Sequence, residues 1–207
     1  PASVVLDGFD LRLAPGEHLA VVGPSGAGKS TFLRLILGFD QPESGDISVG
    51  GVPLSSVDLP GWRARIGWVQ QDPFLIAGTV LENVRLGAGE ASRDDAAAVL
   101  ELVGAADLIP RLGESIGERG AGLSRGERRM VTLARAVVRS PDVLLLDEPT
   151  AGIDSVTQLR IADSFERIAA GRAVVTVAHQ RLLVDLADRV VGIESGRVVA
   201  ARSGDFR

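Results

Sequence analysis

The stretch that most constrains the fold is residues 23–30, Gly-Pro-Ser-Gly-Ala-Gly-Lys-Ser, which fits the phosphate-loop pattern G-x-x-x-x-G-K-[ST]. An apolar run at 18–22 predicts a buried strand leading into the loop, and 31–37 predicts a helix leading out of it. The glycines let the backbone curl so that N–H groups face one hollow, where a helix N-terminus favours an anion. The residues expected to bind a nucleoside triphosphate are Gly23, Pro24, Ser25, Gly26, Ala27, Gly28, Lys29, Ser30 and Thr31.

A second signal is a pair of acids that follows an apolar run. Residues 143–146 are Val-Leu-Leu-Leu, as expected of a central parallel strand covered on both faces, and Asp147 and Glu148 come next. We expect Lys29 to reach the outer phosphates, and Ser30 and Asp147 to hold Mg²⁺. Because successive side chains of a strand point to opposite sides, Glu148 is expected to face the attacking water as a general base or orienting group.

A third signal is His179, which follows the predicted strand 173–177. Parallel strands place their carboxyl ends on the ligand side of such a sheet, which would bring this histidine close to Glu148 or to the terminal phosphate. A lone histidine is often just a satisfied surface or core residue, and spacing alone leaves both interpretations open. His18, on the strand entering the phosphate loop, is interpreted as structural.

The rest of the pattern predicts an α/β fold whose parallel sheet comes from two separated segments. Ser155 and Gln158 are expected to form a capping box on one of its helices. Further strands are expected at 8–13, 46–49, 65–69, 190–193 and 198–200, and further helices at 94–103, 124–138, 155–169 and 180–186. The predicted lobes are a core, residues 1–72 and 140–207, and an inserted helical subdomain, residues 73–139.

Composition narrows the classes of function. The formal net charge is −5, from 27 acidic and 22 basic residues, which argues against a general nucleic-acid binder. Without cysteine, disulfides and thiolate metal sites are excluded. No apolar run approaches the ~20 residues that a membrane-spanning helix needs, and no signal peptide is recognisable. Because the chain begins at Pro1 and its single methionine is Met130, we expect it to be a fragment or a processed product.

In their order along the chain, these motifs resemble the nucleotide-binding domain of ABC transporters, over essentially the whole chain. Gln71 matches the family's glutamine loop, 123–127 stands at the signature, 151–154 matches the loop after the second nucleotide motif, and His179 matches the switch histidine. The resemblance implies a P-loop (RecA-like) core with a small antiparallel β part, and ATP hydrolysis with Mg²⁺. The implied catalytic residues are Glu148, His179, Lys29 and Gln71, the implied Mg²⁺ ligands are Ser30, Gln71 and Asp147, and the implied contacts to ATP held by a partner domain are Ser124 and Gly126.

Local segments resemble exporters within that family. Residues 116–120 and 74–80 are similar to exporter loops, whereas 62–63, 66–71 and 84–86 resemble the CydD-type subunit of the heterodimeric exporter linked to cytochrome bd assembly, thiol compounds and haem. The resemblance implies a second nucleotide-binding domain as partner, in a homodimer or a heterodimer, and the CydD-type resemblance favours the heterodimer. It also implies transmembrane domains outside this chain, no nucleic acid, and a place at the cytoplasmic face of the inner membrane.

Two departures from the family pattern matter. Arg125 stands where the signature normally has glycine, which puts a bulky cation where the backbone should closely approach the partner's ATP. Ser124 and Glu127 also fit a helix-capping box, which is compatible with a phosphate contact. The aromatic residue that usually stacks on adenine has no counterpart, because there is no tyrosine and Phe9 lies too far along; we expect its position to fall before Pro1.

Three other functions are weighed against this interpretation. A soluble ABC-type ATPase, acting as a mechanical clamp in DNA repair or translation, would need basic surfaces, a coiled-coil insertion or a second cassette, and the sequence has none of these. A P-loop kinase is disfavoured by residues 124–127 and by 147–150, Asp-Glu-Pro-Thr. A regulatory module without turnover stays open for one of two composite sites because of Arg125.

Overall fold

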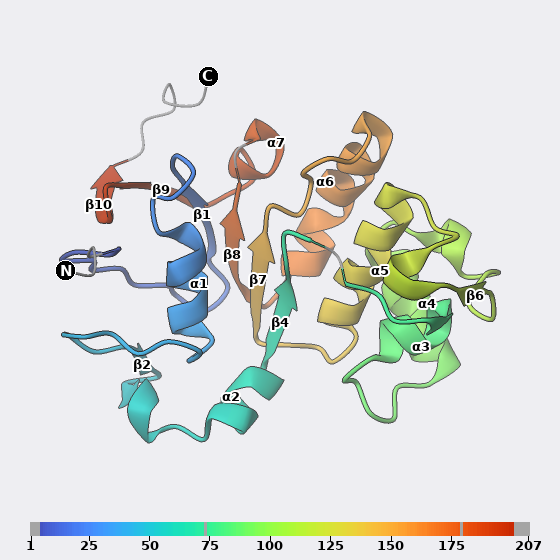
Figure 1. The fold of residues 1–207 in the computed structure, drawn as a ribbon, viewed down its shortest axis with the longest axis horizontal. Coiled ribbons are helices and arrows are strands. Elements are labelled where there is room, and N and C mark those ends of the chain that lie inside the picture. The colour runs from blue at the N-terminus through green and yellow to red at the C-terminus, as the bar shows by residue number, and fades with distance from the viewer. Residues whose placement is uncertain (1–4, 73, 179, 201–207) are drawn as a thin grey trace.

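The computed structural model describes residues 5–72, 74–178 and 180–200, and its largest element is a six-stranded sheet in the order β10-β9-β1-β8-β7-β4 (Figure 1). Strand β10 is antiparallel to β9, and the other neighbours are parallel, which confirms the predicted α/β fold with a mainly parallel sheet. The strands are β1 (His18–Val22), β4 (Ile66–Val69), β7 (Val143–Asp147), β8 (Ala173–Val177), β9 (Arg189–Glu194) and β10 (Arg197–Ala200).

Both faces of this sheet are covered by helices, because its central strands are apolar throughout. Leu145 on β7 packs in one apolar cluster with Phe32 and Leu33 of α1 (Lys29–Ile36). Its neighbours Leu144 and Leu146 point the other way, into a cluster with α5 (Arg125–Val137) and α6 (Ser155–Ala169). Alternate residues of one strand therefore serve two cores, as a parallel sheet between helical layers requires.

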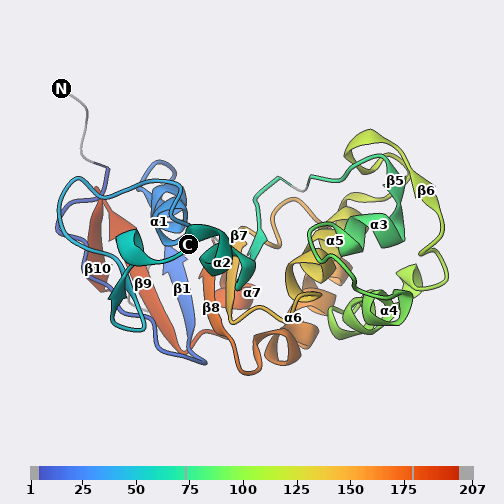
Figure 2. The ribbon, with the colours of Figure 1, turned by 90° about the horizontal axis from the view of Figure 1, so that it is seen from below.

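The helices between the two parts of the sheet gather at one end of the molecule, to the right in Figures 1 and 2. They are α3 (Val80–Arg85), α4 (Arg93–Leu102) and α5. Leu100 of α4 and Leu133 of α5 belong to the same buried cluster as Leu144 and Leu146 of β7. The apolar core is therefore continuous from the sheet into these helices, and the division into two lobes remains an interpretation.

Two small antiparallel sheets lie outside the six-stranded sheet. One is a hairpin of β2 (Ser48–Val49) and β3 (Val52–Pro53), and the other pairs β5 (Gly78–Thr79) with β6 (Ser115–Ile116), which follows α3 and α4 in the chain. The predicted strand at 8–13 is wrong. Its alternation instead reflects one-sided burial without a partner strand: Phe9 packs on Phe32 with ring centroids 5.2 Å apart, and Leu11 and Leu13 pack against the same cluster.

Two short helices complete the fold. Helix α2 (Leu59–Ala64) was not predicted, because Pro60 and Gly61 are residues that usually interrupt helices. The indole N–H of Trp62 donates to the carbonyl of Ile36 at 2.8 Å and holds this helix in place. Helix α7 (Arg181–Val184) lies within the predicted 180–186.

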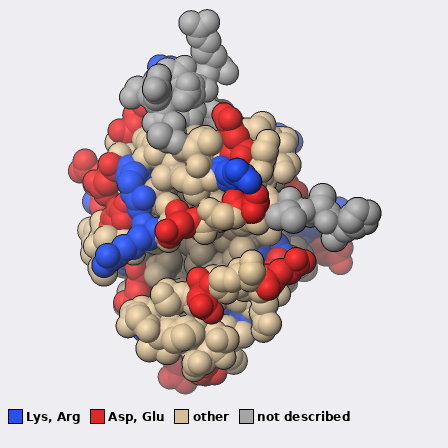
Figure 3. All heavy atoms as spheres, turned by 90° about the vertical axis from the view of Figure 1, so that its left-hand side faces the viewer, with Lys and Arg blue, Asp and Glu red and all other residues tan. Residues whose placement is uncertain are grey.

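The surface carries mixed charge. On the face in Figure 3, acidic and basic side chains lie interspersed among uncharged ones, in keeping with 27 acidic and 22 basic residues in the chain. Among the described residues, no helix combines the length and the apolar character needed to cross a membrane.

Candidate nucleotide-binding site

The phosphate loop connects the buried strand β1 to α1, and two of its glycines are sterically required. Gly23 has φ 151°, and a Cβ atom there would lie 2.3 Å from the carbonyl oxygen of Ile193. Gly28 has φ 104°, and its Cβ would lie 2.7 Å from Leu6 Cδ2. Gly28 is also the N-cap of α1, and no described side chain caps this helix. The first N–H groups of α1 are therefore left for an anion, as the sequence predicts.

Lys29, the one lysine of the 207 residues, lies folded back along this loop. Its Nζ donates to the carbonyl oxygens of Gly23 at 2.7 Å and Pro24 at 2.9 Å, and only 7% of the residue is exposed. Burial lowers the pKa of Lys29, while the nearby carboxylates of Glu148 and Asp147 act in the opposite direction. The structure thus brings the lysine and both acids into one electrostatic environment.

The acids reach this environment through the register of the sheet. Asp147 pairs with Val177 on β8, and Val177 pairs in turn with Val21 on β1, one residue before the end of that strand. The carboxyl ends of β1, β8 and β7 are therefore level, on the edge where ligands bind in parallel sheets. The loop residues Ser30 and Thr31 begin α1 at this same edge, with Ser30 exposed.

The backbone of Glu148 differs from the expectation. Strand β7 ends at Asp147, and Glu148 adopts a left-handed conformation with φ 47°, its N–H donating to the carbonyl of Val177 at 2.9 Å. The expected opposition of the two acids by strand alternation is therefore wrong. A turn at Glu148 replaces it, in a conformation that is uncommon for a residue with a side chain.

Gln71 completes the group of sequence-predicted residues that lie together. It stands two residues after β4, and its Nε2 donates to Oε2 of Glu148 at 3.2 Å. Lys29, Gln71, Asp147 and Glu148 are therefore gathered at one edge of the sheet. His179 lies outside the described residues.

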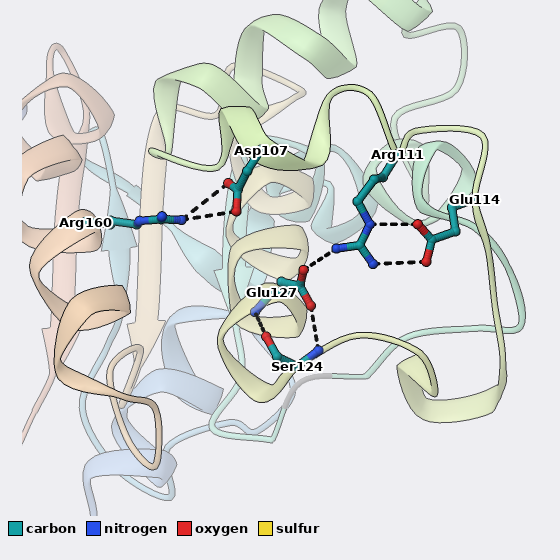
Figure 4. A network of polar contacts seen from close by, with 6 residues as sticks. All are labelled: Asp107, Arg111, Glu114, Ser124, Glu127 and Arg160. Carbon is teal, nitrogen blue, oxygen red and sulfur yellow. Dashed lines mark hydrogen bonds and ion pairs between the residues drawn. The ribbon is translucent and has the colours of Figure 1, made fainter.

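The signature segment forms a separate polar network at the start of α5 (Figure 4). The Ser124 hydroxyl accepts the N–H of Glu127 at 3.1 Å, and Glu127 accepts the N–H of Ser124 at 2.6 Å, so the predicted capping box is confirmed. Arg111 contacts the other oxygen of Glu127 and bonds to Glu114 at 2.7 and 3.0 Å. Burial would raise the pKa of Glu127, but its bonds to Ser124 and Arg111 together lower it.

The side of α5 that carries Arg125 and Gly126 packs against α6 and the loop before it. A Cβ at Gly126 would lie 2.7 Å from Thr157 Oγ1, so glycine is needed there for packing. Arg125 has no positive φ, and its Nη1 donates to the carbonyl of Gly152 at 3.2 Å. The side chain thus lies along the loop after Glu148 without straining the backbone.

The expected capping box at the start of α6 is wrong. Asp154 is the N-cap and accepts the N–H of Thr157 at 2.9 Å, while Gln158 turns back to the carbonyl of Ile153 at 3.1 Å. Aspartate is a favoured N-cap residue, and the carboxylate of Asp154 accepts the N–H three residues ahead, so Ser155 becomes the first residue of the helix instead of its cap.

Ser124 and Gly126 do not join the phosphate loop within this chain. In Figures 1 and 2, α1 and α5 lie on either side of β7 and β8, and the polar contacts of Ser124 are with Glu127. The signature therefore presents its helix end at a different part of the surface.

Sequence reasoning missed the roles of two arginines on α5, the buried Arg129 and the half-buried Arg135. Arg129 donates to the carbonyls of Gln70 and Gln71, and Arg135 to those of Asn83 and Phe74. Arg129 lies four residues before the buried Leu133 and therefore on the same face of the helix, a signal that could have found it.

The donor set is compatible with Mg²⁺ held together with phosphate oxygens. Among the described residues there is no cluster of three or more acidic or histidine side chains that would form a preformed metal cage. The Ser30 hydroxyl, the Asp147 carboxylate and the Gln71 amide offer hard oxygen ligands at one sheet edge. Mg²⁺ suits this arrangement, because it commonly takes one or two protein ligands and completes its shell with phosphate and water.

The parallel sheet, the phosphate loop and the acids beside it define a P-loop nucleoside triphosphatase. The family model for the ABC transporter matches residues 6–151, and the chain belongs to this family as an ATP-hydrolysing domain.

Relatives extend this match over almost the whole chain. The chain is 41% identical over 200 residues to a mycobactin import ATP-binding/permease protein of Mycolicibacterium thermoresistibile, and 36% identical over 202 residues to a multidrug resistance ABC transporter ATP-binding and permease protein of Lactococcus lactis. Each match covers 95% of this chain and 34% of the relative, so the chain spans about a third of their length. A solved bacterial Atm1-family ABC exporter with ATP bound is 34% identical, with a TM-score of 0.88 over 94% of this chain and 35% of that one.

Proposed function

We propose that this domain hydrolyses ATP at an interface with a second ABC nucleotide-binding domain and thereby powers export of a solute across a membrane. One observation carries the proposal. Lys29, Asp147 and Glu148 lie together, whereas Ser124 of the signature lies elsewhere on the same chain. A site that needs both must take the signature from another domain. ATP then favours the closed pair because it binds both surfaces at once.

The proposed roles follow from position. Lys29 and the loop N–H groups bind the β- and γ-phosphates, and Glu148, oriented by Gln71, holds the attacking water. Ser30, Asp147 and Gln71 would hold Mg²⁺, which neutralises phosphate charge when bound. His179, whose position is outside the described residues, is proposed to contact the γ-phosphate. Ser124 and Gly126 would contact the partner's ATP, since the Ser124 hydroxyl already accepts from Glu127 and has its proton left to donate.

The face beside α3 is proposed to meet the transmembrane domains. A hollow of about 430 Å³ opens between Ile76, Glu82 and Leu86. Leu86, which lines the hollow, is 39% exposed, and Phe74, two residues before Ile76, is 61% exposed, so this part of the surface offers apolar side chains to a partner. We propose on this basis that the domain lies at the cytoplasmic face of the inner membrane. Residues 73–139 would then transmit movement as the inserted subdomain.

A narrower assignment is also proposed: a CydD-type subunit in a heterodimer, exporting a thiol- or haem-linked solute. It is supported by the local resemblance at 62–63, 66–71 and 84–86 and by Arg125, which makes one signature unlike the family norm. Import is the second candidate, favoured by the name of the mycobactin relative.

Transport in vesicles tests these proposals. The protein that carries this chain, with its partner, is reconstituted and supplied with ATP at the face bearing this domain. Solute moving away from that face indicates export, and solute moving toward it indicates import. A requirement for a second, different chain would support the heterodimer. Absence of ATP-dependent transport and ATP hydrolysis would overturn the proposed function.

A further inference from the structure

Arg129 on α5 is a buried cation that grips the backbone of the glutamine loop. Only 3% of the residue is exposed. Its Nη1 donates to the carbonyl of Gln70 and its Nη2 to the carbonyl of Gln71, both at 2.7 Å. The planar guanidinium thus fixes two successive peptide groups with one rigid fork. The side chain of the second of these residues is the one that reaches Glu148.

Arg129 is buried among carboxylates that belong to the candidate site. Burial lowers the pKa of Arg129, while the carboxylates of Asp72, Asp147 and Glu148 act in the opposite direction. Its Nε finds no hydrogen-bond partner among the described residues. A buried cation held by main-chain oxygens is costly compared with an apolar residue, and an apolar residue would fit the stripe before Leu133.

We propose that Arg129 is a positioning residue: by holding the backbone at Gln71, it sets the Gln71 side chain against Glu148. Because Arg129 and the cap Ser124 belong to the same helix, a displacement of the signature is passed to the hydrolytic acid through this clamp. The inference deepens the proposed function and rests on it, since it concerns ATP turnover at the same site.

The chain offers a matched control on the same helix. Arg135 is half-buried, and it too donates to main-chain oxygens, with Nε on the carbonyl of Asn83 at 2.8 Å and Nη1 on the carbonyl of Phe74 at 2.7 Å. Burial lowers its pKa to about 10. The hydrogen bonds that the structure gives Arg135 go to Asn83 and Phe74 and not to Gln71. Arg135 therefore holds backbone as Arg129 does, but without the link to Glu148.

The test is a double-mutant cycle on ATP hydrolysis in the assembled transporter. It compares Arg129→Lys and Arg135→Lys, each alone and combined with Gln71→Ala. Arg129→Lys should lower kcat roughly 10- to 100-fold, as misplaced catalytic groups do, with KM for ATP changed much less. In the Gln71→Ala background its further effect should shrink to less than about threefold, because the group it positions is already gone. Arg135→Lys should have the same effect in both backgrounds.

Two results would decide against the inference. If the effects of Arg129→Lys and Gln71→Ala on kcat multiply, Arg129 acts independently of Gln71 and is merely structural. If KM for ATP rises in Arg129→Lys as much as kcat falls, Arg129 contributes to ATP binding and not to positioning. If Arg129→Lys does not fold by its melting curve, Arg129→Gln, which keeps donors without the buried charge, replaces it in the cycle with the same expectation. No turnover in the wild-type protein would overturn the proposed function and this inference with it, whereas measurable turnover with multiplying effects overturns this inference alone.

Discussion

Gln71 and Glu148 face each other because their strands run in step. β4 and β7 are parallel neighbours with Val69 opposite Leu146, and each of the two polar residues stands two positions beyond that pair. The Gln71 amide donates to the Glu148 carboxylate at 3.2 Å. The glutamine loop and Glu148, the proposed hydrolytic acid, are thus joined by sheet register.

Replacing Glu148 by glutamine should leave nucleotide binding intact and lower ATP turnover by about 100-fold or more, since general bases and water-orienting groups commonly contribute that much. The amide keeps the size and the contact with Gln71 but no longer accepts a proton. Phosphate release measures turnover, and equilibrium binding of ATP measures affinity. A variant that retains a near-normal rate with its natural partner would remove Glu148 from its proposed role.

Lys29→Ala should weaken ATP binding itself, by about 10-fold or more, because hydrogen bonds to charged groups are worth roughly 1.5–3 kcal/mol. The matched control is Arg34→Ala on the same helix, whose guanidinium is paired with Asp40 and exposed. Dissociation constants from titration calorimetry should change for the lysine variant only. Equal constants for Lys29→Ala and wild type would contradict the assignment.

Arg111→Gln should destabilise the protein by about 1 kcal/mol, because it removes the ion pairs with Glu127 and Glu114, and partly exposed pairs are each worth roughly 0.2–1 kcal/mol. The side chains of Arg111 and Glu127 are 32% and 24% exposed, so their ion pair is partly shielded from water. Chemical denaturation measures the change in unfolding free energy. Arg160→Gln, which breaks the neighbouring and more exposed pair with Asp107, is the control and should show no measurable change. Similar losses in both variants would show that the network does not support the signature cap.

The free energy of unfolding should fall as pH drops from about 7 toward 5.5, with His18 as a main cause. His18 is 4% exposed, bonded to Thr176 at 2.9 Å, and burial lowers its pKa. The unfolded chain therefore takes up a proton at its ordinary pKa while the folded chain does not, so acid favours unfolding until the folded pKa is also passed. Denaturation at a series of pH values should show a shallower slope for His18→Gln than for wild type. Parallel slopes would place the proton uptake elsewhere.

The sequence predicts the central elements well, because their signals are local and strong. The apolar runs at β1, β7 and β8 and the cap at Ser124 need no tertiary information to be recognised. The failures depend on distant partners. Residues 8–13 alternate like a strand but find no strand to pair with, and Asp154 takes the cap of α6 that was predicted for Ser155.

The part of the site formed by residues at the carboxyl ends of strands could be predicted from the sequence. Parallel strands bring Lys29, Asp147 and Glu148 to one edge, which the pattern indicates directly. The turn at Glu148 and the clamp of Arg129 were not predictable in this way. One depends on a backbone dihedral angle, and the other on how far α5 lies from β4.

The continuous core from β7 into α4 and α5 limits how the domain can deform. A rotation of these helices relative to the sheet would have to open apolar contacts around Leu144, Leu146 and Leu100, all of which are at most 1% exposed. Small rigid tilts of these helices therefore cost less free energy than large rotations. On heating, the sheet and the helices should melt in one calorimetric peak, since neither keeps an intact interior once the other is lost.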